Sequence, residues 1–206
     1  SILRRRGVPT WGVFTQKSEQ GGGALIDIAT HSLDMVLHII DNYKPKMVLG
    51  ITYDRLKYQK ETANPFGPWN VDHYDVEESA FAHLVMENGA TIVIEASWAL
   101  NTSDTSGLRY MICGDKAGAD NYNGKFKING VQNDKLYILE PELKAGGVAF
   151  YDGKDTSPTV MEQTIFIDAT LGKAELVTTP EKAAIVTRIL EAVYISAKTG
   201  KPYYFD

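Results

Sequence analysis

The chain has 206 residues, 44% of them hydrophobic, which is enough for one good core or at most two small ones. Its formal charge of -5 at pH 7 argues against a nucleic-acid partner, and its single cysteine, Cys113, excludes an internal disulfide framework. We expect one cytoplasmic domain over residues 1–206 without a membrane partner, because neither a signal peptide nor a run of about 20 apolar residues is visible.

Residues 1–20 show no clear period, and they are interrupted by Gly7, Pro9 and Gly12, so they are predicted to form an ordered connector. The only basic cluster of the chain, three consecutive arginines at residues 4–6, is interpreted as the solvated end of a strand or loop.

Residues 24–41 have the length and periodicity of a long helix, and three consecutive glycines, Gly21 to Gly23, come directly before it. At about 100° per residue, four polar side chains fall on one narrow stripe of this helix, whereas the remaining faces are apolar. These four are Asp27, His31, Asp34 and His38. A helix that is apolar over most of its circumference is buried, so its polar stripe must face a cleft, a partner or a paired network.

Alternating apolar residues predict several strands after this helix. The predicted strands are residues 46–58, 76–87, 90–100, 108–114 and 135–139, with a short hairpin within 118–130. Asn88-Gly89 between the second and third strands is a strong hairpin signal. In the third strand, Ile92, Ile94, Ala96 and Trp98 point the same way, which predicts a strongly apolar sheet face. The long loop at residues 59–75 is of a length that tends to be functional.

Two further helices are predicted towards the end of the chain, at residues 160–171 and 180–199. Thr179 and Pro180 begin the second of them, and Gly200 ends it before a short final strand at residues 201–206. Strands bracketed by helices without βαβ alternation predict an α+β fold. We expect a largely antiparallel, open-faced sheet with helices packed on one face.

Three parts of the sequence together resemble one known family. They are the Gly-Gly-Gly-x3-Asp-x3-His block that ends at His31, the turn at residues 87–90, and the closing segment at residues 196–201. The chain resembles, over essentially its whole length, the C-terminal domain of the glucose-fructose oxidoreductase, inositol dehydrogenase and MocA (Gfo/Idh/MocA) family. The glycine, aspartate and histidine block is the most specific part of this likeness.

The resemblance implies an oxidoreductase that transfers a hydride between NAD or NADP and a sugar, polyol or related hydroxy compound. Family members consist of a dinucleotide-binding domain followed by an α+β domain that supplies the substrate site and much of the oligomer interface. The chain shows no Gly-x-Gly-x-x-Gly after a strand and no Glu-Lys-Pro segment with the catalytic lysine of the family. We therefore expect a C-terminal fragment that is inactive alone, with the cofactor bound mainly by the absent domain.

Proton transfer is the chemistry that the helix stripe favours. His31 has a side chain whose ordinary pKa lies near neutral pH, so it suits a general acid or base. Asp27, one turn earlier, suits the role of orienting His31 or of binding a substrate hydroxyl. The resemblance implies the same two roles for these residues, with the missing lysine as the third member. Asp34 and His38 are interpreted as structural.

Other residues are weaker site predictions. Trp11 lies just before the glycines and is predicted to wall the substrate cleft, with a core position as the alternative. His73 and Tyr74 end the long loop and are predicted to reach the substrate or a neighbouring subunit, with an ordinary surface-loop position of the histidine as the alternative.

Two alternative functions use the same features differently. The helix stripe offers nitrogen and oxygen ligands, but one straight helix rarely encloses an ion, so we predict no metal site. The open sheet face would be a large apolar patch unless another subunit covers it, which predicts a homo-oligomer through the sheet. A pure interaction domain would have that sheet without a cleft at Asp27 and His31.

Overall fold

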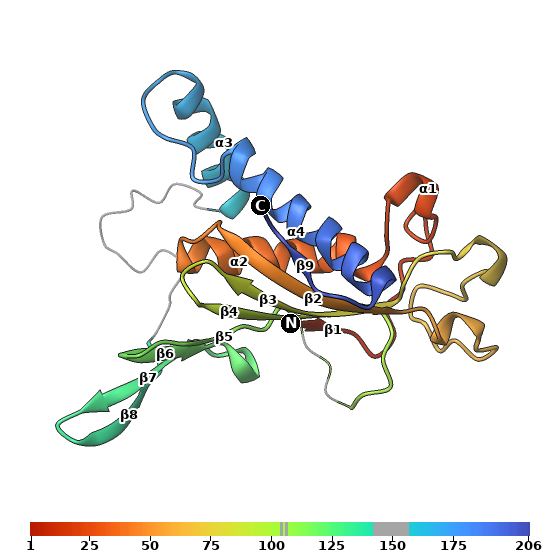
Figure 1. Cartoon of the computed structure of the whole chain (residues 1–206), viewed down its shortest axis with the longest axis horizontal. Coiled ribbons are helices and arrows are strands. Elements are labelled where there is room, and N and C mark those ends of the chain that lie inside the picture. Colours follow the sequence, from red (N-terminus) through yellow and green to blue (C-terminus); the bar gives the residue numbers. More distant parts are fainter. Residues whose placement is uncertain (104, 106, 142–156) are drawn as a thin grey trace. The chain divides into compact units, whose positions relative to one another are not determined.

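A computed structural model describes residues 1–103, 105, 107–141 and 157–206 of the chain (Figure 1). The chain folds into two compact units, each described by itself below. Unit 1 comprises Ser1–Tyr110 and Ala184–Asp206, and unit 2 comprises Met111–Ala183.

Unit 1 is built on a five-stranded sheet with one parallel pair. Its strands, in spatial order, are β1 (Ile2–Leu3), β4 (Thr91–Ser97), β3 (Ser79–Met86), β2 (Pro45–Tyr53) and β9 (Tyr203–Tyr204). β1 pairs in parallel with β4, and every other neighbouring pair is antiparallel. The predicted hairpin joins β3 to β4, and Gly89 in its turn has a φ of 88°, in the left-handed region that glycine adopts most readily.

One face of this sheet is covered by helices. A π-helical turn, η1 (Leu25–Ala29), leads directly into α2 (Thr30–Ile40), and α4 (Pro180–Thr199) lies on the same side of the sheet (Figure 1). A Cβ at Gly50 of β2 would lie 2.6 Å from Cγ1 of Val193, so the glycine lets α4 approach the strand closely. Ile92, Ile94, Ala96 and Trp98 are all buried, as their alternation predicts. The predicted α+β class, with helices packed on one face, is confirmed.

Several short elements complete unit 1. They are α1 (Lys17–Gln20), η2 (Leu56–Tyr58) and η3 (Val71–His73), the last two being 3-10 turns within the long connection between β2 and β3. The first strand after the helix was predicted to run to Tyr58, but β2 ends at Tyr53. After Tyr53 the chain leaves the sheet and forms η2, in which Lys57 is buried and pairs with Asp54 at 2.9 Å.

The helical segment Lys17–Ile40 is long and apolar enough to cross a membrane by length and composition alone, which differs from the sequence expectation. Leu25, Leu33 and Leu37 of this segment are buried in the core of unit 1. A buried core helix has the same composition as a spanning helix, and we therefore interpret the segment as the core helix of this sheet.

Unit 2 contains a second sheet, which is entirely antiparallel. Its strands, in order, are β5 (Met111–Cys113), β6 (Ala117–Asp120), β7 (Lys127–Gln132) and β8 (Lys135–Leu139), with a 3-10 turn η4 (Tyr122–Gly124) between β6 and β7. The helix α3 (Pro158–Thr170) starts at Ser157, whose hydroxyl accepts a bond from the N–H of Val160. The later predicted strands therefore form their own sheet and do not extend the first one.

Candidate active site

The three glycines before the helix allow two close contacts. A Cβ at Gly23 would overlap the carbonyl oxygen of Glu77, and a Cβ at Gly22 would overlap the hydroxyl of Tyr194. Glycine is therefore required at both positions for the helix to start where it does. The sequence pattern identified these glycines as a site feature, and the structure shows that they make room for protein side chains and backbone.

Glu77 satisfies the start of the helix. Its carboxylate accepts hydrogen bonds of 3.0 Å from the backbone N–H groups of Gly23 and Leu25, which have no partner within the helix. The hydroxyl of Tyr194, on α4, donates to Oε1 of Glu77 at 2.8 Å. Burial, and then the negative charge of Glu77, raise the pKa of Tyr194 well above its usual range, so the phenol keeps its proton. Neither Glu77 nor Tyr194 was predicted from the sequence.

The π-helical turn carries Asp27. In such a turn each N–H bonds five residues back, which widens the helix locally and is frequent at functional sites. Oδ2 of Asp27 accepts a hydrogen bond of 2.8 Å from the indole N–H of Trp98, which is fully buried. The carboxylate is thus held at one oxygen, and its other oxygen has no partner within the described part of the chain.

Asp27 lies in the wall of a cavity of about 330 Å³ in unit 1. The cavity is lined by Arg4, Arg6, Gly7, Pro9, Trp11, Phe14, Asp27, Pro65 and Phe66. It brings together the segment before the glycines, the π-helical turn and the long loop. An acid beside aromatic rings and guanidinium groups is a suitable lining for a small polyhydroxy ligand, because hydroxyls need polar partners while sugar C–H faces pack on rings.

Trp11 and Asp27 are the two predicted site residues that share this cavity. Trp11 is 52% exposed, and its ring contacts Phe66 edge-on, with the centroids 4.8 Å apart. His31 lies in the first turn of α2 with its side chain exposed, and no hydrogen bond joins it to Asp27 among the described residues. Asp27 and His31 thus lie in the consecutive helical segments η1 and α2, with no hydrogen bond between them among the described residues.

The two loop residues lie elsewhere. His73 is exposed at the end of η3, and its carbonyl oxygen accepts a bond from the hydroxyl of Thr15. Tyr74 is only 2% exposed, and its ring packs edge-on against Trp69. Burial raises the pKa of the Tyr74 phenol well above its usual range. Neither residue lines the cavity around Asp27, and the phenol of Tyr74 lies within the core.

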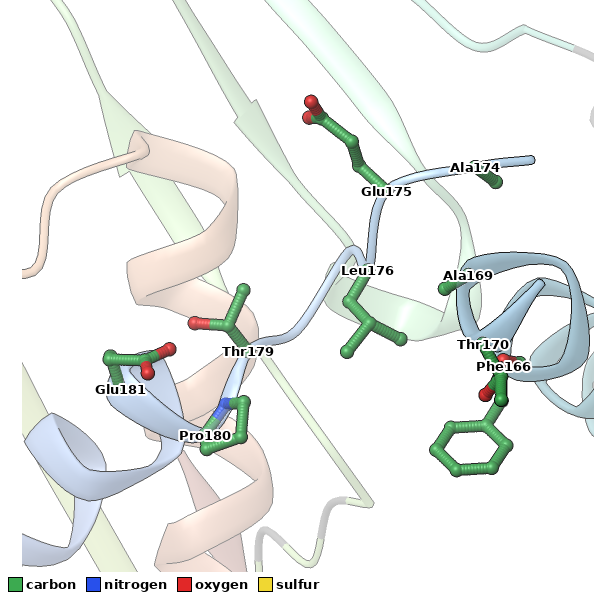
Figure 2. Close-up of a pocket in the computed structure, with 9 residues that line it drawn as sticks. All are labelled: Phe166, Ala169, Thr170, Ala174, Glu175, Leu176, Thr179, Pro180 and Glu181. Atoms are coloured by element: carbon green, nitrogen blue, oxygen red, sulfur yellow. Dashed lines mark hydrogen bonds between the residues drawn. The ribbon is translucent and has the colours of Figure 1, made fainter. Parts of the chain in front are cut away.

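Unit 2 contains a cavity of its own, of about 500 Å³ (Figure 2). It is formed by the last turns of α3, the connecting segment with Glu175 and Leu176, and the first turn of α4. None of the predicted site residues lines it. Its lining is mainly apolar and brings no acid together with a base.

Among the described residues, no group of three or more histidine, cysteine, aspartate or glutamate side chains is placed to hold a metal ion. The two imidazoles and two carboxylates of the helix stripe therefore do not converge on one point.

Known proteins share both the sequence pattern and the fold of this chain. The C-terminal alpha/beta domain of an oxidoreductase family, Gfo/Idh/MocA, matches residues 2–205. The D-glucoside 3-dehydrogenase of Escherichia coli (strain K12) is 32% identical over 198 residues, which are 96% of this chain and 53% of that protein. The chain thus spans about half the length of this relative.

Two solved structures share the fold at low sequence identity. Levoglucosan dehydrogenase in complex with NADH is 17% identical with a TM-score of 0.73, and the match covers 100% of this chain and 56% of that one. GenD2 from gentamicin A biosynthesis, in complex with NAD, is 19% identical with a TM-score of 0.58, covering 98% and 53% of the two chains. At these identities the likeness shows the shared fold.

Proposed function

Because the chain belongs to the Gfo/Idh/MocA oxidoreductase family, as its C-terminal alpha/beta domain, we propose that it is the substrate-binding part of a cytoplasmic dehydrogenase that uses NAD or NADP. The proposed substrate is a sugar, polyol or related hydroxy compound. Support comes from the glucoside-oxidising relative and from the two structural neighbours, which were solved with NADH and NAD. The fragment alone is expected to be inactive.

The position of Asp27 is the observation that carries this proposal. Its carboxylate lies in a cavity wall, is fixed at Oδ2 by Trp98, and precedes the exposed His31 by one turn. A ligand in the cavity can therefore meet an oriented acceptor, while an imidazole lies nearby for proton transfer. Buried polar atoms normally have a hydrogen-bond partner, whereas the second oxygen of this carboxylate has none within the described part of the chain.

In the proposed oxidation the substrate loses two hydrogens: a hydride from its carbinol carbon and a proton from its hydroxyl group. The nicotinamide, when bound, accepts the hydride from the carbinol carbon. His31 takes the hydroxyl proton in oxidation and returns it in reduction, since an imidazole can both accept and release a proton. Asp27 accepts a hydrogen bond from a second hydroxyl of the substrate. Trp11 packs on the sugar face.

His73 and Tyr74 have different roles in the proposal. His73 is exposed on the long loop and is available to a substrate or to a neighbouring subunit. Tyr74, which is buried, would support the loop from within the core.

We also propose that copies of the chain associate through the open face of the first sheet. The side chains that face away from the helices include several exposed apolar groups, namely Leu49, Ile51, Tyr53 and Val93, of which Val93 is 67% exposed. Cross-strand pairing places two of these groups in one row, on either side of the exposed His83: Leu49, His83 and Val93. Exposed apolar patches of this kind mark interfaces, and a symmetric partner would cover the same patch on both copies.

The second candidate function is a non-catalytic interaction domain that uses this sheet face alone. The same exposed strands favour it. It differs from the dehydrogenase in assigning no role to Asp27 and His31.

The decisive experiment measures NAD(H) and NADP(H) turnover by the full-length protein over a panel of sugars and polyols. The variant His31→Ala is expected to lose most of the turnover while it still binds the cofactor. His38→Ala is the matched control, because His38 is also exposed and lies on the same helix.

Equal activity of the His31→Ala variant and the parent would remove His31 from the mechanism. A parent that binds no nucleotide would favour the interaction domain.

A further inference from the structure

The two arginines in the wall of the cavity are used differently by the fold. Arg6 is fully engaged: its Nε donates to the carbonyl of Thr62 at 3.1 Å, and its Nη2 donates to Asn101 at 2.9 Å and to Gln59 at 3.4 Å. These bonds join the first segment to the long loop and to the end of β4. Arg6 is therefore a structural clamp, although its positive charge still reaches the cavity.

Arg4 is anchored by its backbone but keeps its guanidinium largely unused. Its backbone N–H donates to the carbonyl of Ser97 at 2.9 Å. The stem of its side chain lies across Gly7, where a Cβ would come within 2.7 Å of Cδ. Among the described residues, the guanidinium makes a single hydrogen bond, of 3.3 Å, to the carbonyl of Gly7. Within this part of the chain, most of its five N–H donors thus have no protein acceptor.

The one carboxylate in the cavity wall is not the partner of Arg4. Asp27 takes its hydrogen bond from Trp98, and no ion pair within 4.0 Å joins it to Arg4 among the described residues. The lining therefore includes two arginines against one acidic residue, in a chain whose formal charge is -5. Pro9, Phe14 and Phe66 fill much of the remaining wall, and such apolar surroundings strengthen the field of an unpaired charge.

We propose that Arg4 is a specificity-determining residue that binds a negatively charged group of the substrate, so that the cavity selects an acidic sugar such as a uronic acid glycoside. The planar guanidinium can donate two hydrogen bonds to a carboxylate of opposite charge. A hydroxyl is neutral and cannot form such an ion pair. Asp27 would repel the same group, which leaves the carboxylate only the Arg4 side of the cavity. This inference rests on the proposed function and names the substrate class for it.

The test compares two substrates that differ only at C6, methyl β-D-glucuronide and methyl β-D-glucoside, on the full-length protein. The parent is expected to have the higher kcat/KM for the glucuronide. Arg4→Gln is expected to lower that value by about ten- to a hundredfold, with a change of less than about threefold for the glucoside, since a charged hydrogen bond contributes roughly this much. Arg4→Lys, which keeps the charge but not the fork, should retain part of the preference.

Arg5→Gln is the matched control, because Arg5 is an exposed neighbour in the same run of arginines and does not line the cavity. Thermal unfolding of each variant shows whether it is folded. A parent that prefers the glucoside, or an Arg4→Gln variant that loses both activities equally, would overturn the proposal. A rise in the KM of the dinucleotide alone would also overturn it, because the bound anion would then be a cofactor phosphate.

Binding measurements separate this inference from the proposed function. If the parent oxidises neither glycoside with NAD or NADP, the dehydrogenase function is in error for these sugars. Calorimetric titration with D-glucuronate and D-glucose then tests Arg4 by itself. Binding of glucuronate that Arg4→Gln abolishes would support the anion site, and equal binding of both sugars would exclude it.

Discussion

The indole N–H of Trp98 donates a hydrogen bond of 2.8 Å to Oδ2 of Asp27, across 71 residues of chain. Trp98 comes directly after β4, and Asp27 lies in the π-helical turn above the sheet. The bond fixes one oxygen of a carboxylate that belongs to a cavity-lining residue. A buried donor of this kind positions an acid without contributing a group of its own to the ligand.

Trp98→Phe is therefore expected to reduce activity more than stability. The phenyl ring keeps most of the packing, whereas the loss of the N–H frees the carboxylate to rotate. In the full-length enzyme we expect kcat/KM to fall by about ten- to a hundredfold, as misplacement of a site group commonly does. Steady-state kinetics and thermal unfolding of the same preparation measure the two effects.

The matched control is Trp69→Phe, since the N–H of this second buried tryptophan donates to the carbonyl of Lys57 at 2.8 Å, away from the cavity. Trp69→Phe should lower the melting temperature about as much as Trp98→Phe does, and it should leave kcat/KM near the parent value. Equal losses of activity in the two variants would show that Trp98 acts only through general packing.

The hydrogen bonds that Glu77 accepts from the start of the helix are expected to stabilise the protein. Glu77→Ala leaves the N–H groups of Gly23 and Leu25 buried without an acceptor, so we expect the free energy of unfolding to fall by at least about 2 kcal/mol. Tyr194→Phe removes one bond to the same carboxylate and should cost about 1 kcal/mol. Urea unfolding measures both, and a Glu77→Ala variant as stable as Tyr194→Phe would contradict the capping role.

The close approach at Gly23 is tested separately. Gly23→Ala would force a Cβ against the carbonyl oxygen of Glu77 and is expected to destabilise the protein strongly. Gly107→Ala, where a Cβ would meet no atom within 4 Å, should have little effect and serves as the control. The two variants add the same methyl group, so a similar loss of stability in both would mean that Gly23 is not in close contact.

Local patterns in the sequence predicted much of the fold and only part of the site. The alternation of Ile92 and Ile94 was sufficient to predict the buried face of β4, and α4 begins and ends where Pro180 and Gly200 predicted. The strand alternation and the helix boundaries are determined by residues that are close together in the sequence. The pairing of Asp27 with Trp98 depends on how the helix lies over the sheet, which no local pattern encodes.

Other site features also depend on tertiary contacts. A regular helix was predicted over residues 24–41, but its first turn widens into a π-helical turn. Glu77 caps that helix from 52 to 54 residues away. The only signal in the sequence was its position beside Glu78, where two adjacent carboxylates precede a buried strand and must be paired or neutral.

Glu78 itself predicts a dependence of stability on pH. It is 2% exposed, one oxygen accepts a bond from the N–H of Leu56, and burial raises the pKa of its carboxyl above the ordinary value of 4.5. The folded state then keeps this proton at pH values where the unfolded state has lost it. The contribution of Glu78 to the free energy of unfolding therefore falls as the pH rises from about 4.5 through the raised pKa.

Glu78→Gln removes this titration and keeps an oxygen for the N–H of Leu56. The stability of the variant relative to the parent is expected to increase with pH across that window, as measured by urea unfolding from pH 4 to 9. The exposed Glu87→Gln variant shows whether loss of any carboxyl gives the same trend. A difference between Glu78→Gln and the parent that stays constant with pH would mean that Glu78 ionises alike in both states.

The open face of the first sheet gives the last prediction, on association. Val93 is 67% exposed on the open face of the sheet and is the direct cross-strand neighbour of His83. A charge at this position would be buried without a partner if two copies met face to face, so Val93→Arg should shift the full-length protein towards the monomer. Light scattering after gel filtration measures the mass. Val131→Arg is the control, because Val131 is 64% exposed on β7 of the other sheet. An oligomer that tolerates Val93→Arg as well as Val131→Arg would exclude this face as the interface.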